Sequence, residues 1–293
     1  MKYFHFFLIV GFSFLCACGS NEEPTSPINP TPDPEPEQEP RGLTIPADGF
    51  ISPSTYDGME LVWADEFDGS QLNTDDWNFD IGTGVNGWGN LEDQYYLEEN
   101  TSIVEGNLVI EAKRESFGGK SYTSSRITTE GKQDFQYGRI DVRAVMPSGG
   151  GMWPAIWMLG SNFSEVGWPF CGEIDIMELF GDRGDNKVFG TVHWDNAGQY
   201  AQFGGETTLP SGGFNDKFYV FSITWDEQFI KWYIDDIEYH VIDITPAQLE
   251  EFRKKFFFII NLAIGGDKGA GRPTGSLYPQ WMVVDYIRVF QQG

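Results

Sequence analysis

The chain has few cysteines, few histidines and few basic residues. Three cysteines occur in 293 residues, and two of them, Cys16 and Cys18, lie within the first 18 residues. The remaining Cys171 has no partner for an internal disulfide in the rest of the chain. Beyond the first 18 residues the histidines are His193 and His240, which argues against a histidine-rich metal site.

Basic residues are outnumbered by acidic ones. Nineteen Lys and Arg stand against 44 Asp and Glu, so the formal net charge is −25. A chain this acidic is not attracted to nucleic acid or to anionic membrane surfaces, which excludes those partners. A neutral substrate such as an uncharged glycan is compatible with it. Aromatic residues make up 16% of the chain, which indicates a large core or an aromatic cleft.

Residues 1–18 are typical of a secretory signal. Lys2 supplies the positive charge, and the apolar stretch 4–15 is too short to span a bilayer. The spacing of Cys16 and Cys18 after this stretch resembles a bacterial lipobox, which implies that Cys18 is lipidated. An ordinary secretory signal with incidental cysteines is the alternative. We expect a protein anchored by lipid to the bacterial outer membrane, facing the cell surface or the periplasm.

Residues 19–47 are predicted to form a linker. Between Glu22 and Pro46 the chain carries eight of its 16 prolines and six acidic residues. Such a segment cannot bury enough apolar surface to fold, and its prolines favour extended polyproline II conformation. The working domain is therefore expected to comprise residues 48–293.

The pattern from residue 59 onward predicts β-strands separated by Gly-rich turns. The expected strands alternate in polarity or carry β-branched residues. They are 59–63, 107–112, 138–143, 188–194, 219–225, 256–262 and 282–290. A hairpin is expected over residues 229–241, turning at Asp235 and Asp236.

One helix is expected after Thr245. Thr245 begins a capping box, Pro246 takes the first helical position, and Leu249 and Phe252 supply an apolar face. Many strands with one short helix predict an all-β domain, either a large sandwich or a barrel.

Three carboxylates stand in the otherwise apolar, strand-like segment 172–180. Acidic residues are poor strand formers, so their presence here needs an explanation. Glu173 and Asp175 share one face because side chains alternate along a strand, whereas Glu178 has the opposite parity. One extra residue, most simply Met177, would return Glu178 to that face through a β-bulge, a feature found beside active sites.

Two carboxylates on one concave face suit glycosidic hydrolysis. On a flat strand the Cα atoms of Glu173 and Glu178 would lie roughly 13 Å apart, whereas retaining glycosidases need carboxyl groups about 5–5.5 Å apart. The strand must therefore curve inward. Three carboxyl groups this close cannot all ionise, so at least one pKa rises, as a general acid requires. The alternative is a solvated acidic face.

Three tryptophans precede the acidic segment. Trp153 and Trp157 are four residues apart and share a face if that segment is a strand, and Trp168 follows them. Aromatic faces stack on the C–H faces of pyranose rings, so a sugar cleft is one interpretation. Packing in the core is the alternative for each ring.

Together these motifs resemble glycoside hydrolase family 16, in its laminarinase-like branch. The resemblance rests on the spacing of Glu173, Asp175 and Glu178 after the segments 153–159 and 167–169. Further blocks match in order, at residues 86–90, 94–96, 125–128, 190–194, 261–266 and 284–289. The resemblance implies a β-jelly-roll of two stacked, curved antiparallel sheets with an open cleft on the concave face, and catalysis without a cofactor.

The resemblance also implies roles for individual residues. Glu173 would be the nucleophile, Glu178 the acid/base, and Asp175 would hold and polarise the nucleophile. Seven further residues are implied to bind substrate: Trp153, Trp157, Trp168, His193, Arg126, Asn261 and Asn86. For His193 the alternative is a hydrogen-bonded core histidine.

A structural calcium on the convex side is a further implication of the resemblance. The matching positions are Glu66, the backbone of Gly106, and Asp285, whose oxygens would suit Ca²⁺. Surface acids without a metal are the alternative. The segment 90–94 departs from the commoner family order, which puts glycan contacts there in doubt.

The expected function is endo-acting, retaining hydrolysis of β-1,3-glucosidic bonds in laminarin-type β-glucan by a monomer. Mixed-linkage β-1,3-1,4-glucan is the second candidate substrate, and galactans of the agar and carrageenan type follow. A non-catalytic glycan-binding protein on the same fold and an adhesin on a lipid stalk are the alternatives without catalysis.

Overall fold

The computed structural model describes residues 42–267, 270–273 and 278–293. The predicted signal segment 1–18 and most of the predicted linker lie outside the described residues. Within the described ranges no helix has the length and hydrophobicity needed to span a membrane. Leu43 and Ile45 pack against a small apolar cluster of the folded unit, so its contacts begin a few residues before position 48.

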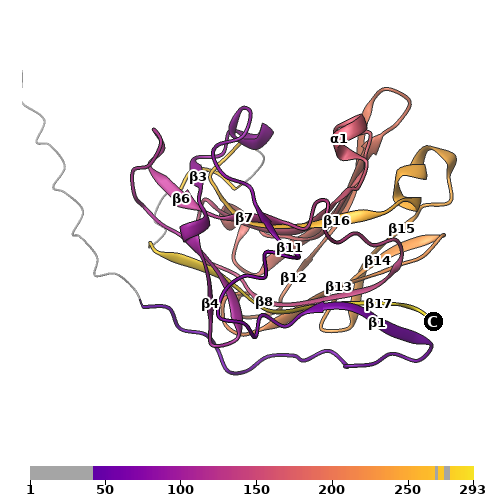
Figure 1. The fold of residues 1–293 in the computed structure, drawn as a ribbon, viewed down its shortest axis with the longest axis horizontal. Helices are drawn as coiled ribbons and strands as arrows, with labels where there is room; N and C mark the ends of the chain where they lie inside the picture. Colours follow the sequence, from indigo (N-terminus) through magenta and orange to yellow (C-terminus); the bar gives the residue numbers. More distant parts are fainter. Residues whose placement is uncertain (1–41, 268–269, 274–277) are drawn as a thin grey trace, which may run out of the picture. The chain divides into compact units, whose positions relative to one another are not determined.

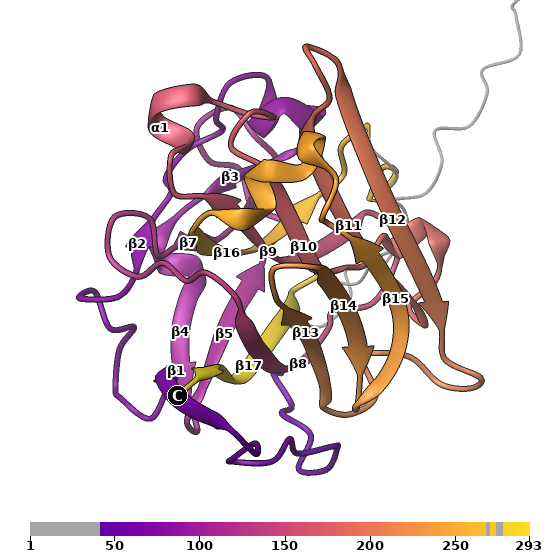
Figure 2. The same ribbon diagram turned by 90° about the vertical axis from the view of Figure 1, so that its right-hand side faces the viewer.

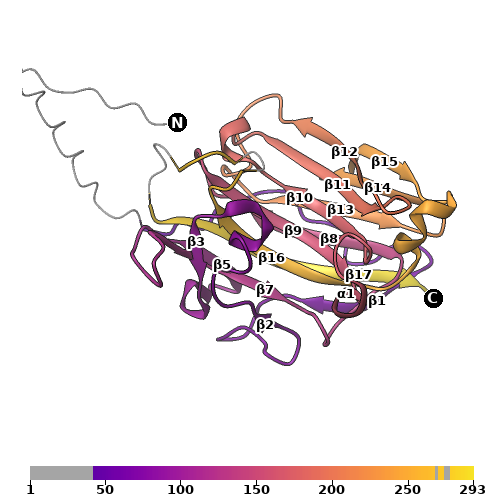
Figure 3. The ribbon, with the colours of Figure 1, turned by 90° about the horizontal axis from the view of Figure 1, so that it is seen from above.

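Two antiparallel sheets lie one above the other, which confirms the expected all-β sandwich (Figure 1). The seven-stranded sheet has the spatial order β12 (Tyr200–Thr208), β11 (Lys187–Asp195), β10 (Glu173–Glu178), β9 (Met152–Gly160), β16 (Phe256–Ile264), β7 (Arg126–Thr128) and β2 (Asn78–Phe79). Figure 3 shows these strands side by side from above.

The second sheet has eight strands. Its order is β15 (Ile237–Asp243), β14 (Phe229–Ile234), β13 (Tyr219–Trp225), β8 (Gly138–Val145), β17 (Gln280–Gln292), β5 (Asn107–Ala112) and β4 (Thr101–Val104), with β1 (Met59–Asp65) paired to β17. At one edge of the sandwich β12 lies against β15 (Figure 2). A short parallel pair, β3 (Gln94–Tyr96) and β6 (Tyr122–Ser124), completes the strands of the described residues.

The expected strands and hairpin are confirmed. Each predicted strand segment lies within an observed strand, and β14 and β15 pair in antiparallel fashion around the two-residue turn. Asp235 and Asp236 have φ values of 48° and 64°, as a type I′ turn requires, and aspartate tolerates this conformation better than most residues.

Helical segments are short. They are α1 (Phe163–Val166), the π-helical η1 (Gly87–Leu91), and the 3₁₀ turns η2 (Glu98–Asn100), η3 (Gly181–Arg183) and η4 (Ala247–Arg253).

The prediction of a capped helix after Thr245 was wrong in the type of helix and in its cap. Thr245 Oγ1 donates to Asp243 Oδ1 at 2.6 Å instead of capping a helix, and Pro246 occupies the N-cap position. The segment is a 3₁₀ helix interrupted at Leu249, where φ is −115°. Leu249 and Phe252 are buried, as the apolar pattern predicted.

The space between the sheets is filled by one large apolar cluster. Strand β10 contributes Ile174, Ile176 and Met177 to it, each fully buried. Burying such side chains stabilises the fold by about 1.5–3 kcal/mol each. Because this face of β10 is committed to the core, its acidic side chains lie on the opposite face of the sheet.

Candidate active site

Strand β10 carries the acidic residues and contains the expected bulge. Two steps from Asp175 to Met177 are matched by a single step on β9, so β10 has one extra residue. Opposite β9 the unpaired residue is Ile176, where Met177 was expected, and opposite β11 both residues lie between the paired Asp175 and Glu178. Ile176 and Met177 both point into the core, which returns Glu178 to the face that carries Asp175.

Trp232 of β14 supports the bulge from the core side. Its Nε1–H donates to the carbonyl oxygen of Asp175 at 2.8 Å, which gives a backbone group a partner where the strand ladder is interrupted. Gly190 of β11 makes room for this indole, since a Cβ there would lie 2.4 Å from Trp232 Cδ1. The second sheet thus helps to hold the acidic face of the first.

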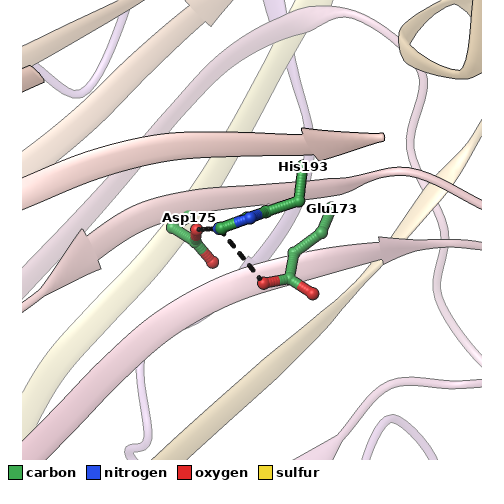
Figure 4. Close-up of side chains that lie close together, drawn as sticks. All are labelled: Glu173, Asp175 and His193. Atoms are coloured by element: carbon green, nitrogen blue, oxygen red, sulfur yellow. Dashed lines mark hydrogen bonds and ion pairs between the residues drawn. The ribbon is translucent and has the colours of Figure 1, made fainter. Parts of the chain in front are cut away.

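Neighbouring strands bring further groups to the carboxylates. Register places Glu173 opposite His193 of β11 and Glu178 opposite Ala155 of β9. His193 Nε2 lies 3.0 Å from Asp175 Oδ2 and 3.7 Å from Glu173 Oε1 (Figure 4). Ala155 leaves β9 without a bulky side chain opposite Glu178. The structure therefore gathers the three predicted carboxyl groups and His193 on one face.

Burial perturbs all three carboxyl groups. It raises the pKa of Glu173 to about 8, negative charge on Asp175 adds to the rise, and His193 opposes it. Burial, followed by the charge of Glu178, raises the pKa of Asp175 well above its usual range. The pKa of Glu178 is also raised by burial, against the effects of His193 and a hydrogen bond from Trp153. A raised pKa favours the protonated form of Glu178, which general acid catalysis needs.

Two of the predicted tryptophans orient other site residues. Trp153 Nε1 donates to Glu178 Oε1 at 2.9 Å, and Trp157 Nε1 donates to Asn261 Oδ1 at 2.7 Å. Trp168 lies in the loop before β10 and is 47% exposed. Its ring lies beside that of Tyr200, with the two centroids 5.3 Å apart, at the solvent-facing edge of the site.

Arg126 of β7 lies between two indole rings. Its guanidinium carbon is 4.5 Å from the ring centre of Trp88 and 4.9 Å from that of Trp157, and its Nε donates to Asp80 at 2.8 Å. Cation–π contact on both faces fixes the side chain next to Trp157. Asn86 is exposed at the start of the Trp88 loop with φ 52°. This position forms the turn, and the substrate role of Asn86 stays a prediction.

The sequence patterns did not indicate the hydrogen-bond chain that lies behind Trp157. Asn261 Nδ2 donates to Tyr96 Oη at 3.1 Å, and Tyr96 Oη donates to Glu92 Oε2 at 3.1 Å. Glu92 is 4% exposed and also accepts from Gln94 Nε2 at 2.6 Å. The segment 90–94, which departs from the commoner family order, thus provides a buried carboxylate that anchors this hydrogen-bond chain. Its one sequence signal was an acidic residue just before a strand.

At the predicted calcium positions both carboxylates are paired with arginine side chains. Glu66 accepts from Arg288 Nε and Nη2 at 2.7 and 2.8 Å, and Asp285 accepts from Arg143 Nη1 at 2.7 Å. Gly106 lies in the turn between β4 and β5. Because guanidinium groups already compensate both carboxylates, these residues as placed do not fit a hard divalent cation.

The fold and the site together define a class of protein. Two stacked antiparallel sheets, with two glutamates on one bulged strand and tryptophans beside them, are the arrangement of a β-sandwich glycoside hydrolase. The model of the family Glycosyl hydrolases family 16 matches residues 64–269. The chain belongs to this family.

Known proteins of similar sequence and structure agree with this assignment. The beta-glucanase of Rhodothermus marinus is 40% identical over 248 residues, covering 79% of this chain and 85% of that protein. The clotting factor G alpha subunit of Tachypleus tridentatus is 37% identical over 79% of this chain, which spans only 34% of that longer protein. The laminarinase catalytic domain from Thermotoga maritima superimposes with a TM-score of 0.75 at 44% identity, covering 81% of this chain and all of that domain.

Hydrolysis in family 16 needs no cofactor. Ligand atoms of Glu173, Asp175 and His193 lie within 4.8 Å of one another, a spacing that could hold a metal ion. In the present arrangement His193 instead bonds Asp175 directly. The cluster is therefore organised by hydrogen bonds between its own side chains.

Proposed function

We propose that this chain is an endo-acting, retaining hydrolase of β-1,3-glucosidic bonds in laminarin-type glucan. The observation that carries the proposal is the bulge, because it returns Glu178 to the face of β10 that holds Glu173 and Asp175. Glu173 attacks the anomeric carbon while Glu178 protonates the departing oxygen. Glu178 then takes a proton from water, which releases the sugar from Glu173.

Asp175 and His193 assist the nucleophile in this proposal. Asp175 lies between the glutamates in sequence and is 2% exposed, so its carboxyl group is shielded from solvent and contacts other groups of the site. His193 reaches both Asp175 and Glu173 from β11. The hydrogen bond between His193 and Asp175, together with the closeness of His193 to Glu173, orients the nucleophile before substrate arrives, which reduces the reorganisation needed during reaction.

The proposed substrate is a neutral, coiled glucan. A formal charge of −25 disfavours sulfated galactans, and the similar Thermotoga maritima domain is a laminarinase. The indoles of Trp157 and Trp168 come from different elements, a strand and a loop, so they can contact successive sugars at different angles. Successive rings of a β-1,3 chain also turn relative to one another. The remaining cleft residues, among them Arg126 and Asn261, would contact sugars or hold these rings.

The substrate proposal is tested by a parallel assay on laminarin, barley mixed-linkage glucan, cellulose and agarose. Product sizes are followed over time, with Glu173→Ala as the blank. We expect laminarin to be cleaved fastest, and internal cleavage to give a broad ladder of early products. Cleavage of agarose without laminarin would overturn the proposal. Faster cleavage of the barley glucan would favour a mixed-linkage enzyme, and binding without product would favour a glycan-binding protein.

We further propose that the enzyme is a secreted lipoprotein of the outer membrane and a monomer. Its lipid anchor would be attached to Cys18, and the linker 19–47 would connect this anchor to the catalytic domain. The lipobox-like spacing supports this location. Cys18→Ala is expected to move the protein from the membrane fraction to the soluble fraction, because multiple acyl chains anchor firmly and their loss leaves no membrane contact. Fractionation of full-length protein with Cys16→Ala as control checks it. An unchanged membrane fraction would contradict lipidation of Cys18.

A further inference from the structure

A hydrogen-bond chain runs from the edge strand β12 into the proposed active site. His193 Nε2 lies 3.0 Å from Asp175 Oδ2, and His193 Nδ1 lies 2.7 Å from Tyr200 Oη. Tyr200 Oη in turn donates to Gln202 Oε1. The rings of His193 and Tyr200 stack, with centroids 5.8 Å apart and planes 17° apart. Tyr200 was not among the residues expected from the sequence.

The direction of this chain follows from counting protons. A tyrosine hydroxyl has one hydrogen, and Tyr200 gives it to Gln202. With Gln202 accepting through its amide oxygen, Tyr200 accepts from His193 in turn, which assigns the hydrogen to Nδ1. If the ring is neutral, Nε2 is bare and must receive a proton from Asp175. If the ring is charged, Nε2 donates to an ionised Asp175. In both cases the His193–Asp175 pair holds two protons and carries no net charge, whereas with Nδ1 bare it would hold one proton and be negative.

The second proton of this pair changes the environment of the nucleophile. Besides burial, negative charge on Asp175 is the main influence that raises the pKa of Glu173. A proton shared with His193 offsets that charge, so Glu173 ionises more readily. The pKa of Tyr200 is itself raised to about 12, by burial and then by the charges of Glu173, Asp175 and Glu178. Its hydroxyl therefore keeps its hydrogen at neutral pH.

The other groups around His193 do not interrupt this hydrogen-bond chain. Glu173, Asp175 and Glu178 face it from β10, and Tyr200 faces it from β12. Trp168, from the loop before β10, packs its uncharged ring 5.3 Å from Tyr200. Among these groups, Tyr200 forms the hydrogen bond with His193 Nδ1.

We propose that Tyr200 is a positioning residue for hydrolysis, which fixes His193 with Nδ1 protonated and so keeps the His193–Asp175 pair free of net charge. The inference rests on the function proposed for this site. Tyr200 acts through His193 and Asp175, and its ring also forms part of the aromatic rim with Trp168.

Tyr200→Phe tests the proposal because it removes the oxygen and keeps the ring. We expect kcat on laminarin to fall about ten-fold, the effect of losing one hydrogen bond to a charged group, while KM changes less than about two-fold. Without the acceptor the second proton of the His193–Asp175 pair is no longer held, Asp175 becomes charged, and Glu173 is harder to ionise. The acidic limb of the pH–rate profile should therefore move to higher pH. Phe203→Leu, on the opposite face of β12 beside His240, is the control and should match wild type.

Nitrogen-15 NMR of histidine-labelled protein reads the ring directly and does not depend on activity. We expect a protonated Nδ1 on His193 in wild type. In Gln202→Leu the hydroxyl of Tyr200 is free to donate to His193, so Nδ1 should become the unprotonated nitrogen.

The outcomes separate cleanly. In Tyr200→Phe, a change in KM alone or an unchanged pH profile would overturn the positioning role, and so would an unchanged His193 spectrum in Gln202→Leu. A wild-type protein that shows protonated Nδ1 and the Gln202→Leu reversal, yet hydrolyses no glucan, would overturn the proposed function and leave the proton arrangement standing.

Discussion

Glu173→Ala is expected to abolish hydrolysis of laminarin, with a loss of about 10⁴-fold or more in kcat. On the reacting face of β10 the other acidic residues are Asp175, which is bonded to His193, and Glu178, which is bonded to Trp153. Neither replaces a missing nucleophile, because Glu178 is needed as the acid. Initial rates on laminarin measure the effect, and thermal unfolding checks that the variant folds.

Added azide provides a sharper test of the same residue. In Glu173→Ala the small anion can enter the vacated space and displace the leaving group of an aryl β-laminarioside, forming the α-configured glycosyl azide. Glu238→Ala removes a carboxylate from β15 of the other sheet, where it lies 3.7 Å from Lys231, and should behave as wild type. Recovery of a β-azide from Glu173→Ala would show that Glu173 is not the nucleophile.

Glu178→Gln is expected to separate two classes of substrate. Hydrolysis of laminarin should fall about 10²–10⁴-fold, because protonation of the departing sugar oxygen is lost. The first step on an aryl glycoside should persist, since a phenolate leaves without a proton, so the variant should release a burst of phenol and then stall. Stopped-flow absorbance measures this burst. Equal loss on both substrates would remove Glu178 from the acid role.

The pH profile gives the same assignment in another form. Wild-type activity requires an ionised Glu173 and a protonated Glu178, so the profile is bell-shaped. Because burial raises the pKa of both groups, activity should extend to higher pH than exposed carboxyl groups would allow. It is lost on the basic side as Glu178 deprotonates. In Glu178→Gln, the basic limb should disappear from the first step on the aryl glycoside.

The parts of the fold set by local rules could be predicted from the sequence. Alternation along strands placed the acidic residues on a defined face, and the parity of Glu178 was enough to indicate a bulge. The turn at Asp235 and Asp236 also followed from turn chemistry. The choice of Ile176 as the extra residue depended on pairing with β9, which sequence parity cannot show.

Other features depend on particular side-chain partners that the sequence pattern does not show. Thr245 was expected to cap a helix, but the nearby Asp243 competes for its hydroxyl. Tyr200 lies on an edge strand whose side chains are mostly exposed, so no apolar alternation marked it. The buried carboxylate of Glu92 depends on Tyr96 and the more distant Asn261 for its place in the site.

The central claim is that Glu173 and Glu178 act from one bulged strand as nucleophile and acid/base in hydrolysis of a β-1,3-glucan. Proton NMR of laminarin digestion in its first minutes tests it most directly, since it shows both cleavage and the configuration of the new reducing end before mutarotation. The account predicts that the first-formed product is the β-anomer, because two displacements restore the original configuration. An initial α-anomer, or no cleavage by the folded enzyme, would contradict it.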